Sequence, residues 1–233
     1  MITEYKNKLF SVLGDSITTF EGVSEPEFAA FYDNYNKLLG NIYSPKQTWW
    51  GIVIDALGGE LLVNNSISGS TVTWHPSYEI PSYACSDERT SSLSRGEIAP
   101  DVIMVYIGTN DWGRGVRVTL DESHGKEDPA VFSSAYRIML EKLKKNYPKA
   151  EIWCLSLAVS KCSKMNDFEF PYTYGGRHIS EYCAAIKECA EQFGCRFIDL
   201  YNTQSPYDTI DGFHANSEGM QALAEAVLNE LNN

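Results

Sequence analysis

The sequence predicts an α/β fold in which helices cover both faces of a five-stranded parallel sheet. Short apolar runs rich in β-branched and aromatic residues alternate along the chain with longer segments whose apolar residues recur at helical spacing. Strands that alternate with helices form right-handed βαβ units, which build a parallel sheet with helices on both faces. Neither a repeat nor a change in composition divides the 233 residues, so we expect one domain over residues 1–233.

Five apolar runs have the length and composition of buried strands, and four segments have the periodicity of amphipathic helices. The predicted strands are residues 9–13, 60–64, 102–107, 151–157 and 195–200. The predicted helices are residues 49–57, 129–147, 179–193 and 220–231. The first helix stops at Gly58, a residue suited to a helix C-cap. The second is expected to begin with Asp128 as N-cap and Pro129 as first helical residue, and Pro148 prevents its continuation.

The composition is that of an ordinary globular protein with an acidic surface. Hydrophobic residues make up 43% of the chain, and 19 Lys+Arg against 31 Asp+Glu give a formal net charge of −12. Such a surface repels phosphate backbones and anionic headgroups, so we expect neither a nucleic-acid nor a membrane partner. The six cysteines form no CxxC pair, and we expect free thiols.

The polar start of the chain lacks the apolar stretch of a signal peptide, and no run of about 18 apolar residues occurs. We therefore expect a soluble, cytoplasmic protein, although a chain from which a leader had been removed would look the same. No pattern indicates the oligomeric state.

Three long connections, residues 17–46, 70–100 and 158–177, each follow the C-terminal end of a predicted strand. Connections of this length in a compact domain are usually functional. In an open α/β sheet the strand ends on this side form the edge where ligands bind. We therefore expect the functional site at this edge.

Four short motifs fall at the same edge. They are Gly14-Asp15-Ser16, Ser66-Ile67-Ser68-Gly69-Ser70, Gly108-Thr109-Asn110-Asp111 and Asp211-Gly212-Phe213-His214. Each alone has an ordinary structural interpretation, as a helix N-cap, a bend, a turn or a surface Asx-turn. Together they provide what acyl transfer needs: a hydroxyl nucleophile, a base that takes its proton, and fixed donors for an oxyanion.

We predict catalytic roles for three of these residues. Ser16 is the predicted nucleophile and His214 the base, because Asp211 three residues earlier can accept the Nδ1 proton and leave Nε2 facing the serine. The side-chain amide of Asn110 and the backbone N–H groups of Gly69 and Ser16 are the predicted oxyanion donors. Neither a metal-ligand pattern nor a phosphate-binding glycine loop is present, so we expect no metal and no cofactor.

Aromatic residues are frequent in the long connections and beside the third motif. They are Trp74, Tyr78, Tyr83, Trp112, Phe168, Phe170, Tyr172 and Tyr174. Such amphipathic rings suit sugar faces or an acyl pocket, although packing within the loops is the simpler alternative. We expect Trp112 and Trp74 to contact the substrate, Trp112 because Asn110 beside it must face the reacting carbonyl.

In order and content, the four motifs resemble those of the SGNH hydrolases, also called the GDSL lipase/acylhydrolase family, from about residue 9 to residue 232. The resemblance implies a three-layer α/β/α, flavodoxin-like sandwich, hydrolysis of small esters, and the roles given above for the five site residues. After Ser16 the chain reads Ile17-Thr18-Thr19, where the long form of the motif begins with leucine. This difference favours the compact esterase branch, which includes carbohydrate acetylesterases, over long-chain lipases.

The sequence therefore predicts a serine esterase that acts on small acyl esters, mainly acetyl groups on carbohydrates, through an acyl-Ser16 intermediate. Two alternatives stay open. An acyltransferase could use the same three residues with an alcohol in place of water, and a non-catalytic carbohydrate-binding protein could share the fold.

Overall fold

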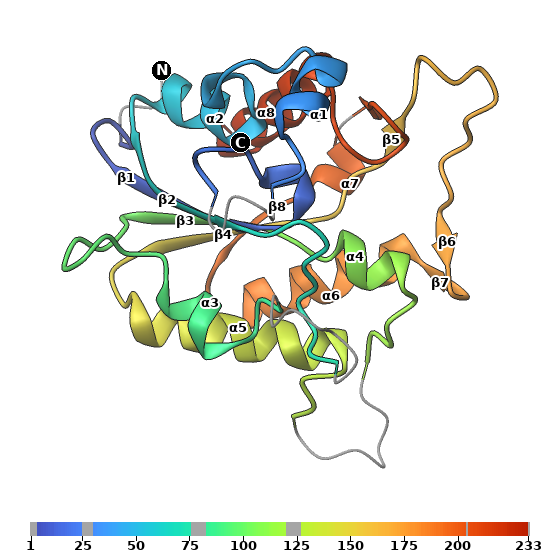
Figure 1. Ribbon diagram of the computed structural model, residues 1–233. Helices are drawn as coiled ribbons and strands as arrows, with labels where there is room; N and C mark the ends of the chain where they lie inside the picture. Colours follow the sequence, from blue (N-terminus) through green and yellow to red (C-terminus); the bar gives the residue numbers. More distant parts are fainter. Residues whose placement is uncertain (1–3, 25–29, 76–82, 120–126, 204, 233) are drawn as a thin grey trace.

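The structure is a computed structural model that describes residues 4–24, 30–75, 83–119, 127–203 and 205–232. Five parallel strands form its central sheet, in the spatial order β2-β1-β3-β4-β8 (Figure 1). The strands are β1 (Leu9–Gly14), β2 (Glu60–Ser66), β3 (Val102–Tyr106), β4 (Glu151–Leu155) and β8 (Arg196–Ile198). All five predicted strands are confirmed.

The central strand β3 shows why these sequences form a doubly covered sheet. All five of its residues are buried, and they alternate between two apolar clusters on opposite faces. Val102, Met104 and Tyr106 belong to one cluster. Ile103 and Val105 belong to the other. Successive side chains of a strand point to opposite faces, so a run of apolar residues requires a packed layer on each side.

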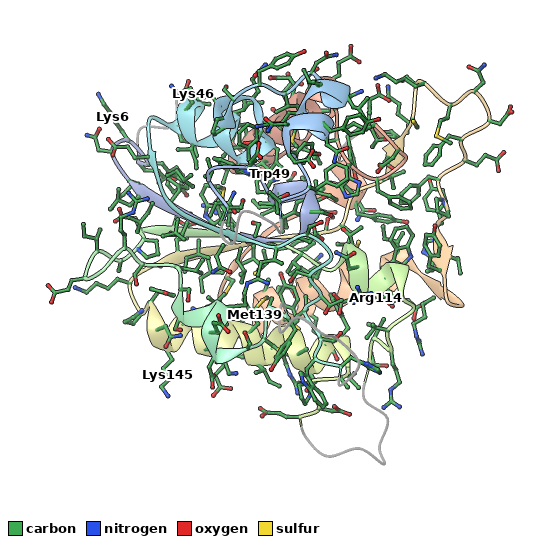
Figure 2. All side chains as sticks on the ribbon, viewed as in Figure 1. Lys6, Lys46, Trp49, Arg114, Met139 and Lys145 are labelled. Atoms are coloured by element: carbon green, nitrogen blue, oxygen red, sulfur yellow. The ribbon has the colours of Figure 1, made fainter. Side chains whose placement is uncertain are left out.

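Helices form these two outer layers, as predicted. On one face, α2 (Trp49–Leu57) packs against α8 (Ser217–Leu231). On the other, α5 (Phe132–Asn146) packs against α6 (Ile179–Gln192) and the short α3 (Asp87–Ser91). Trp49 and Met139, labelled in Figure 2, lie on opposite sides of the sheet. The arrangement is a three-layer α/β/α sandwich.

The predicted start of the second helix is wrong, because α5 begins at Phe132 rather than at Pro129. Asp128 begins a turn instead of capping the helix. Its Oδ1 accepts a hydrogen bond from the amide of Ala130 at 2.9 Å, and its carbonyl accepts one from the amide of Val131 at 3.0 Å. A proline at the second position of a turn stabilises that conformation as well as it would the first turn of a helix.

The connections between the main strands and helices contain short elements of their own. The helical ones are η1 (Ser16–Thr18), α1 (Asn34–Gly40), η3 (Pro45–Gln47), α4 (Thr109–Gly113) and α7 (Leu200–Thr203). The extended ones are a parallel pair, β5 (Ser160–Lys161) with β9 (Tyr207–Asp208), and an antiparallel hairpin, β6 (Thr173–Tyr174) with β7 (Arg177–His178). The six cysteines are free, as expected.

The strand order places a crevice beside β1. From β1 the chain runs outward to β2 and then crosses to β3 on the other side, so the connections after β1 and β3 diverge. Ligands of open α/β sheets bind at such a switch point, outside the carboxyl ends of the strands. No helix within the described ranges has both the length and the apolar composition needed to cross a bilayer.

Candidate active site

A tight turn at the end of β1 presents Ser16. Asp15 caps the short helix η1, and its Oδ1 accepts a hydrogen bond from the amide of Ile17 at 3.1 Å. The turn requires glycine at position 14, because a Cβ there would lie 2.7 Å from Cβ of Thr18. Burial raises the pKa of Asp15 to about 7, and its Oδ2 finds no hydrogen-bond partner among the described residues.

Ser16, His214 and Asp211 form a hydrogen-bonded series. Oγ of Ser16 lies 2.8 Å from Nε2 of His214, and Nδ1 of the same ring lies 2.7 Å from Oδ2 of Asp211. Oδ1 of Asp211 accepts the amides of Phe213 and His214, at 3.0 and 2.9 Å. Burial raises the pKa of Asp211, but the hydrogen bonds and charge of His214 outweigh it and lower the pKa to about 2. An ionised carboxylate therefore holds the imidazole.

The third motif begins α4 and reaches across to the connection after β2. Nδ2 of Asn110 donates a hydrogen bond to the carbonyl oxygen of Ser70 at 2.9 Å. The carboxylate of Asp111 accepts the amide of Val72 at 2.8 Å and the hydroxyl of Thr73 at 2.7 Å. Burial raises the pKa of Asp111 to about 6, against the lowering effect of these donors. These contacts join the second and third motifs.

The two backbone amides that we predict as oxyanion donors have no acceptor in the part of the chain that the structure describes. Neither Ser16 nor Gly69 donates its N–H to another described residue. Gly69 has φ +75°, a conformation that favours glycine, and its carbonyl accepts Nη2 of Arg114 at 3.3 Å. Their oxyanion role stays a prediction.

A cavity of about 300 Å³ opens beside the serine and the histidine. It is lined by Ser16, Ile17, Thr109, Asn110, Gly113, Arg114, Tyr174, Phe213 and His214. Arg114, labelled in Figure 2 beside α4, is the cation of this wall. The structure thus brings Ser16, Asn110 and His214 to one cavity, while Gly69 is not part of its lining.

Neither Trp112 nor Trp74, the two residues predicted to contact the substrate, belongs to the lining of this cavity. Trp112 is 1% exposed. Its ring stacks on Phe170 with centroids 5.3 Å apart and meets the ring of Tyr174, which lines the cavity, edge to face. Residues two apart on a helix point about 200° apart, so Trp112 faces the core when Asn110 faces the cavity. Trp74 lines a separate depression together with Tyr83 and other residues. Tyr78 lies outside the described residues.

Arg89 is a structurally important residue that the sequence did not reveal. Its side chain is 2% exposed, and burial lowers its pKa to about 9. The guanidinium donates to Oγ of Ser70 at 2.7 Å, to the carbonyl of Gly14 at 3.1 Å and to the carbonyl and side-chain oxygens of Asn65. It thereby joins the ends of β1 and β2. Between Glu88 and Thr90, an arginine looks like an ordinary solvated surface residue.

A carboxylate, an imidazole and a hydroxyl in this order form the arrangement with which serine hydrolases activate the hydroxyl oxygen. Within the described part of the chain, no group of three His, Cys, Asp or Glu side chains could hold a metal ion. Of the other histidines, His178 caps α6 through Nδ1, which accepts the amide of Ser180.

Comparison with known proteins identifies the family. The model of the GDSL-like lipase/acylhydrolase family matches residues 8–166, a range that includes Ser16, Gly69 and Asn110. A structure from Bacteroides uniformis, named as a GDSL-like lipase, is 27% identical, with a TM-score of 0.71 over 97% of this chain and 96% of that one.

Two structures of lower identity share the fold. A carbohydrate acetylesterase from Sinorhizobium meliloti is 16% identical, with a TM-score of 0.64 over 97% and 99% of the two chains. The Mycobacterium smegmatis aryl esterase is also 16% identical, with a TM-score of 0.62 over 97% and 98%. No functionally curated protein matches the chain. Because the family model covers more than half of the sequence, the chain belongs to the GDSL-like lipase/acylhydrolase family of hydrolases.

Proposed function

We propose that this protein is a serine esterase that removes small acyl groups, in particular acetyl groups, from carbohydrates through an acyl-Ser16 intermediate. The observation that carries the proposal is the series from Ser16 through His214 to Asp211, with distances of 2.8 and 2.7 Å, at the wall of a cavity. This geometry gives the hydroxyl a base within hydrogen-bond reach, and the base a fixed orientation.

In the first half of the reaction, Nε2 of His214 takes the proton of Ser16 while Oγ attacks the ester carbonyl carbon. The carboxylate of Asp211 accepts the Nδ1 proton and stabilises the imidazolium that forms. The tetrahedral intermediate collapses when the bond to the alcohol oxygen breaks, and His214 returns the proton to that oxygen. The products are the free alcohol and acyl-Ser16.

In the second half, a water molecule takes the place of the alcohol. His214 removes its proton, the hydroxide oxygen attacks the acyl carbon, and the bond to Oγ breaks as the proton returns to Ser16. The negative oxygen of each tetrahedral intermediate needs donors. The backbone amides of Ser16 and Gly69, which have no acceptor among the described residues, would supply two of them. Nδ2 of Asn110, which also donates to the carbonyl of Ser70, would supply a third.

Two observations support a small acyl group on a carbohydrate. The cavity holds about 300 Å³, and part of its wall is the aromatic rings of Tyr174 and Phe213, surfaces that suit a sugar face or a short acyl group. The carbohydrate acetylesterase from Sinorhizobium meliloti has the same fold. We therefore propose a small-molecule or carbohydrate ester as the substrate.

Hydrolysis of p-nitrophenyl acetate by the wild type and by Ser16→Ala tests the reaction. We expect turnover by the wild type in the presence of EDTA and none above background by Ser16→Ala. Ser91→Ala, at an exposed position of α3, is the matched control and should keep full activity. Equal rates of wild type and Ser16→Ala would overturn the assignment of the nucleophile.

The acyl and alcohol groups need a second comparison. We expect acetyl p-nitrophenyl ester to react faster than the octanoyl ester, and acetylated sugars to release acetate. A clear preference for octanoyl would contradict the small acyl group. Acetyl transfer to an added sugar that exceeds hydrolysis would indicate an acyltransferase, and sugar binding without turnover of any ester would indicate a binding protein.

A further inference from the structure

Two adjacent aromatic residues, Phe31 and Tyr32, contact the loop that carries His214. We propose that Phe31 is a positioning residue for His214: it fixes the plane of the imidazole, and Tyr32 ties it to the loop that carries the histidine. The inference rests on the proposed function, in which His214 is the base.

The rings of Phe31 and His214 are stacked, with centroids 3.4 Å apart and an angle of 9° between their planes. Hydrogen bonds of an imidazole lie in the ring plane, so the plane that directs Nε2 to Ser16 must also direct Nδ1 to Asp211. A small rotation of the ring would lengthen both bonds. The flat face of Phe31 blocks that rotation on one side.

Phe31 is itself held by the turn that presents the serine. Its amide donates a hydrogen bond to Oγ1 of Thr19 at 2.8 Å, and the Thr19 hydroxyl donates to the carbonyl oxygen of Ser16 at 2.8 Å. One hydroxyl can accept the first bond and donate the second. The position of Phe31 is therefore set relative to Ser16.

Tyr32 makes the connection to the histidine loop. Its hydroxyl donates to the carbonyl oxygen of Ala215, the residue after His214, at 2.8 Å, and the tyrosine side chain is fully buried. The rings of Phe31 and Tyr32 meet edge to face, with centroids 5.1 Å apart. The pair thus contacts His214 and Ala215 directly and is connected to Ser16 through the hydroxyl of Thr19.

The sheet alone does not provide this support. Ser16 follows β1, an interior strand of the five-stranded sheet, but His214 follows β9, which within the described residues forms a separate pair with the two-residue strand β5. The face of an aromatic ring also attracts a cation, so the stack favours the imidazolium that forms when His214 takes the serine proton. Both effects act on the transition state rather than on substrate binding.

The test compares Phe31→Leu, which keeps an apolar side chain but loses the flat ring, with Phe31→Tyr, which keeps the ring. We expect kcat for p-nitrophenyl acetate to fall about tenfold or more in Phe31→Leu, with KM changed less than about twofold, because a misplaced catalytic group costs rate at the chemical step. Phe31→Tyr should retain most of the wild-type kcat. Tyr35→Leu, at a 67% exposed position of α1, is the matched control and should match the wild type.

A second variant covers the case in which Phe31→Leu does not fold. Tyr32→Phe removes only the hydroxyl that bonds to Ala215, and we expect a smaller loss of kcat in the same direction. Equal losses in Phe31→Leu and Phe31→Tyr, or wild-type kcat in both Phe31→Leu and Tyr32→Phe, would overturn the positioning role.

NMR gives a readout that does not depend on turnover. The chain has four histidines, so the ring signals of His214 can be assigned by comparison with His214→Ala. A stacked phenyl ring shifts the carbon-bound protons of His214 upfield, and this shift should disappear in Phe31→Leu and persist in Phe31→Tyr. Unchanged His214 signals in Phe31→Leu would overturn the inference, even if the protein hydrolyses no ester. Absence of Ser16-dependent turnover in the wild type, with the NMR shift present, would overturn the proposed function alone.

Discussion

The guanidinium of Arg89 donates a hydrogen bond to the carbonyl oxygen of Gly14, two residues before Ser16, from a side chain that is 2% exposed. The same group binds Oγ of Ser70, whose carbonyl accepts Nδ2 of Asn110. A buried cation therefore links the turn of the predicted nucleophile to the predicted oxyanion donors. Its burial is compensated by four hydrogen bonds to oxygen atoms.

We expect Arg89→Lys to lower the free energy of unfolding by about 2–4 kcal/mol. A lysine ammonium keeps the charge but cannot reach all the oxygen atoms that accept hydrogen bonds from the planar guanidinium. Urea unfolding measures this loss. Arg95→Lys, on the same connection, is the control, since Arg95 is exposed and its Nη2 donates to the carbonyl oxygen of Leu62 at 2.6 Å. A loss in Arg89→Lys no larger than that in Arg95→Lys would show that the buried bonds contribute nothing.

Asn110→Ala should lower kcat for p-nitrophenyl acetate about 10²–10³-fold and leave KM nearly unchanged, because an oxyanion donor acts only when the negative charge has formed. Steady-state kinetics separates the two parameters. Asn229→Ala, at an exposed position of α8, serves as the matched control. If KM rises and kcat is unaffected, Asn110 binds the ground state and is not an oxyanion donor.

Two neighbouring glycines allow a test of the cavity wall. Gly175 and Gly176 both have positive φ, at +53° and +77°, and form the turn of the β6–β7 hairpin that carries Tyr174. A Cβ on Gly175 would lie 2.6 Å from Cα of Gly115, whereas one on Gly176 meets nothing within 4 Å. Both alanine variants suffer the strain of a left-handed residue, about 1 kcal/mol.

Only Gly175→Ala must also displace the hairpin from Gly115, which follows α4. We expect kcat/KM for acetyl esters to fall about tenfold in Gly175→Ala through a higher KM, since the aromatic wall is misplaced. Gly176→Ala should keep the wild-type value. Kinetics of both variants with the acetyl and octanoyl esters checks this, and equal behaviour of the two would remove the hairpin from substrate binding.

Asp15 gives a prediction about pH. Burial raises its pKa from 3.8 to about 7, so between these values the folded protein holds a proton on Asp15 that the unfolded chain has released. Because the folded state binds more protons there, stability falls as pH rises through this window. Asp15→Asn has no such proton but can still accept the amide of Ile17 through Oδ1.

We therefore expect the free energy of unfolding of the wild type, relative to Asp15→Asn, to fall by a few kcal/mol between pH 4 and pH 8. Urea unfolding of both proteins across this range measures the difference. Asp208→Asn is a control of opposite sign. Hydrogen bonds from Ser163 and Asn216 outweigh the effect of burial and lower the pKa of Asp208. The free energy of unfolding of the wild type, relative to this variant, should therefore fall as pH falls below about 4. A pH-independent difference for Asp15→Asn would contradict the buried neutral carboxyl.

The elements that the sequence predicted correctly are those with a strong local pattern. β3 is a run of five buried apolar residues, and α2 ends at Gly58, which has φ +70°. The placement of Ser16 and Asn110 at one cavity also followed from sequence, because their motifs come after β1 and β3, two neighbouring parallel strands that end at the same edge. His214 reaches the same cavity from the segment after β9, outside the five-stranded sheet.

What the sequence could not predict depends on the rotation of a short helix about its axis and on side-chain contacts between separate segments. At the turn that precedes α5, the amide of Asp128 donates to Oγ of Ser134 at 2.6 Å, a contact that no sequence pattern indicates. Trp112 faces the core because of how the short helix α4 is rotated about its axis, and the sequence does not indicate that rotation. Arg89 meets Gly14 across 75 positions, and no local periodicity indicates a contact of that range.

The hydrogen bond between Ser16 and His214 also has a consequence for folding. It closes a loop of nearly the whole chain, with 198 positions between its ends, and contacts of such range form late because their entropy cost must be met by structure already in place. A partly folded chain can therefore contain β1, β3 and their covering helices and still lack a base beside the serine. Recovery of hydrolytic activity during refolding would report the docking of the last segment onto the first, rather than the formation of the sheet.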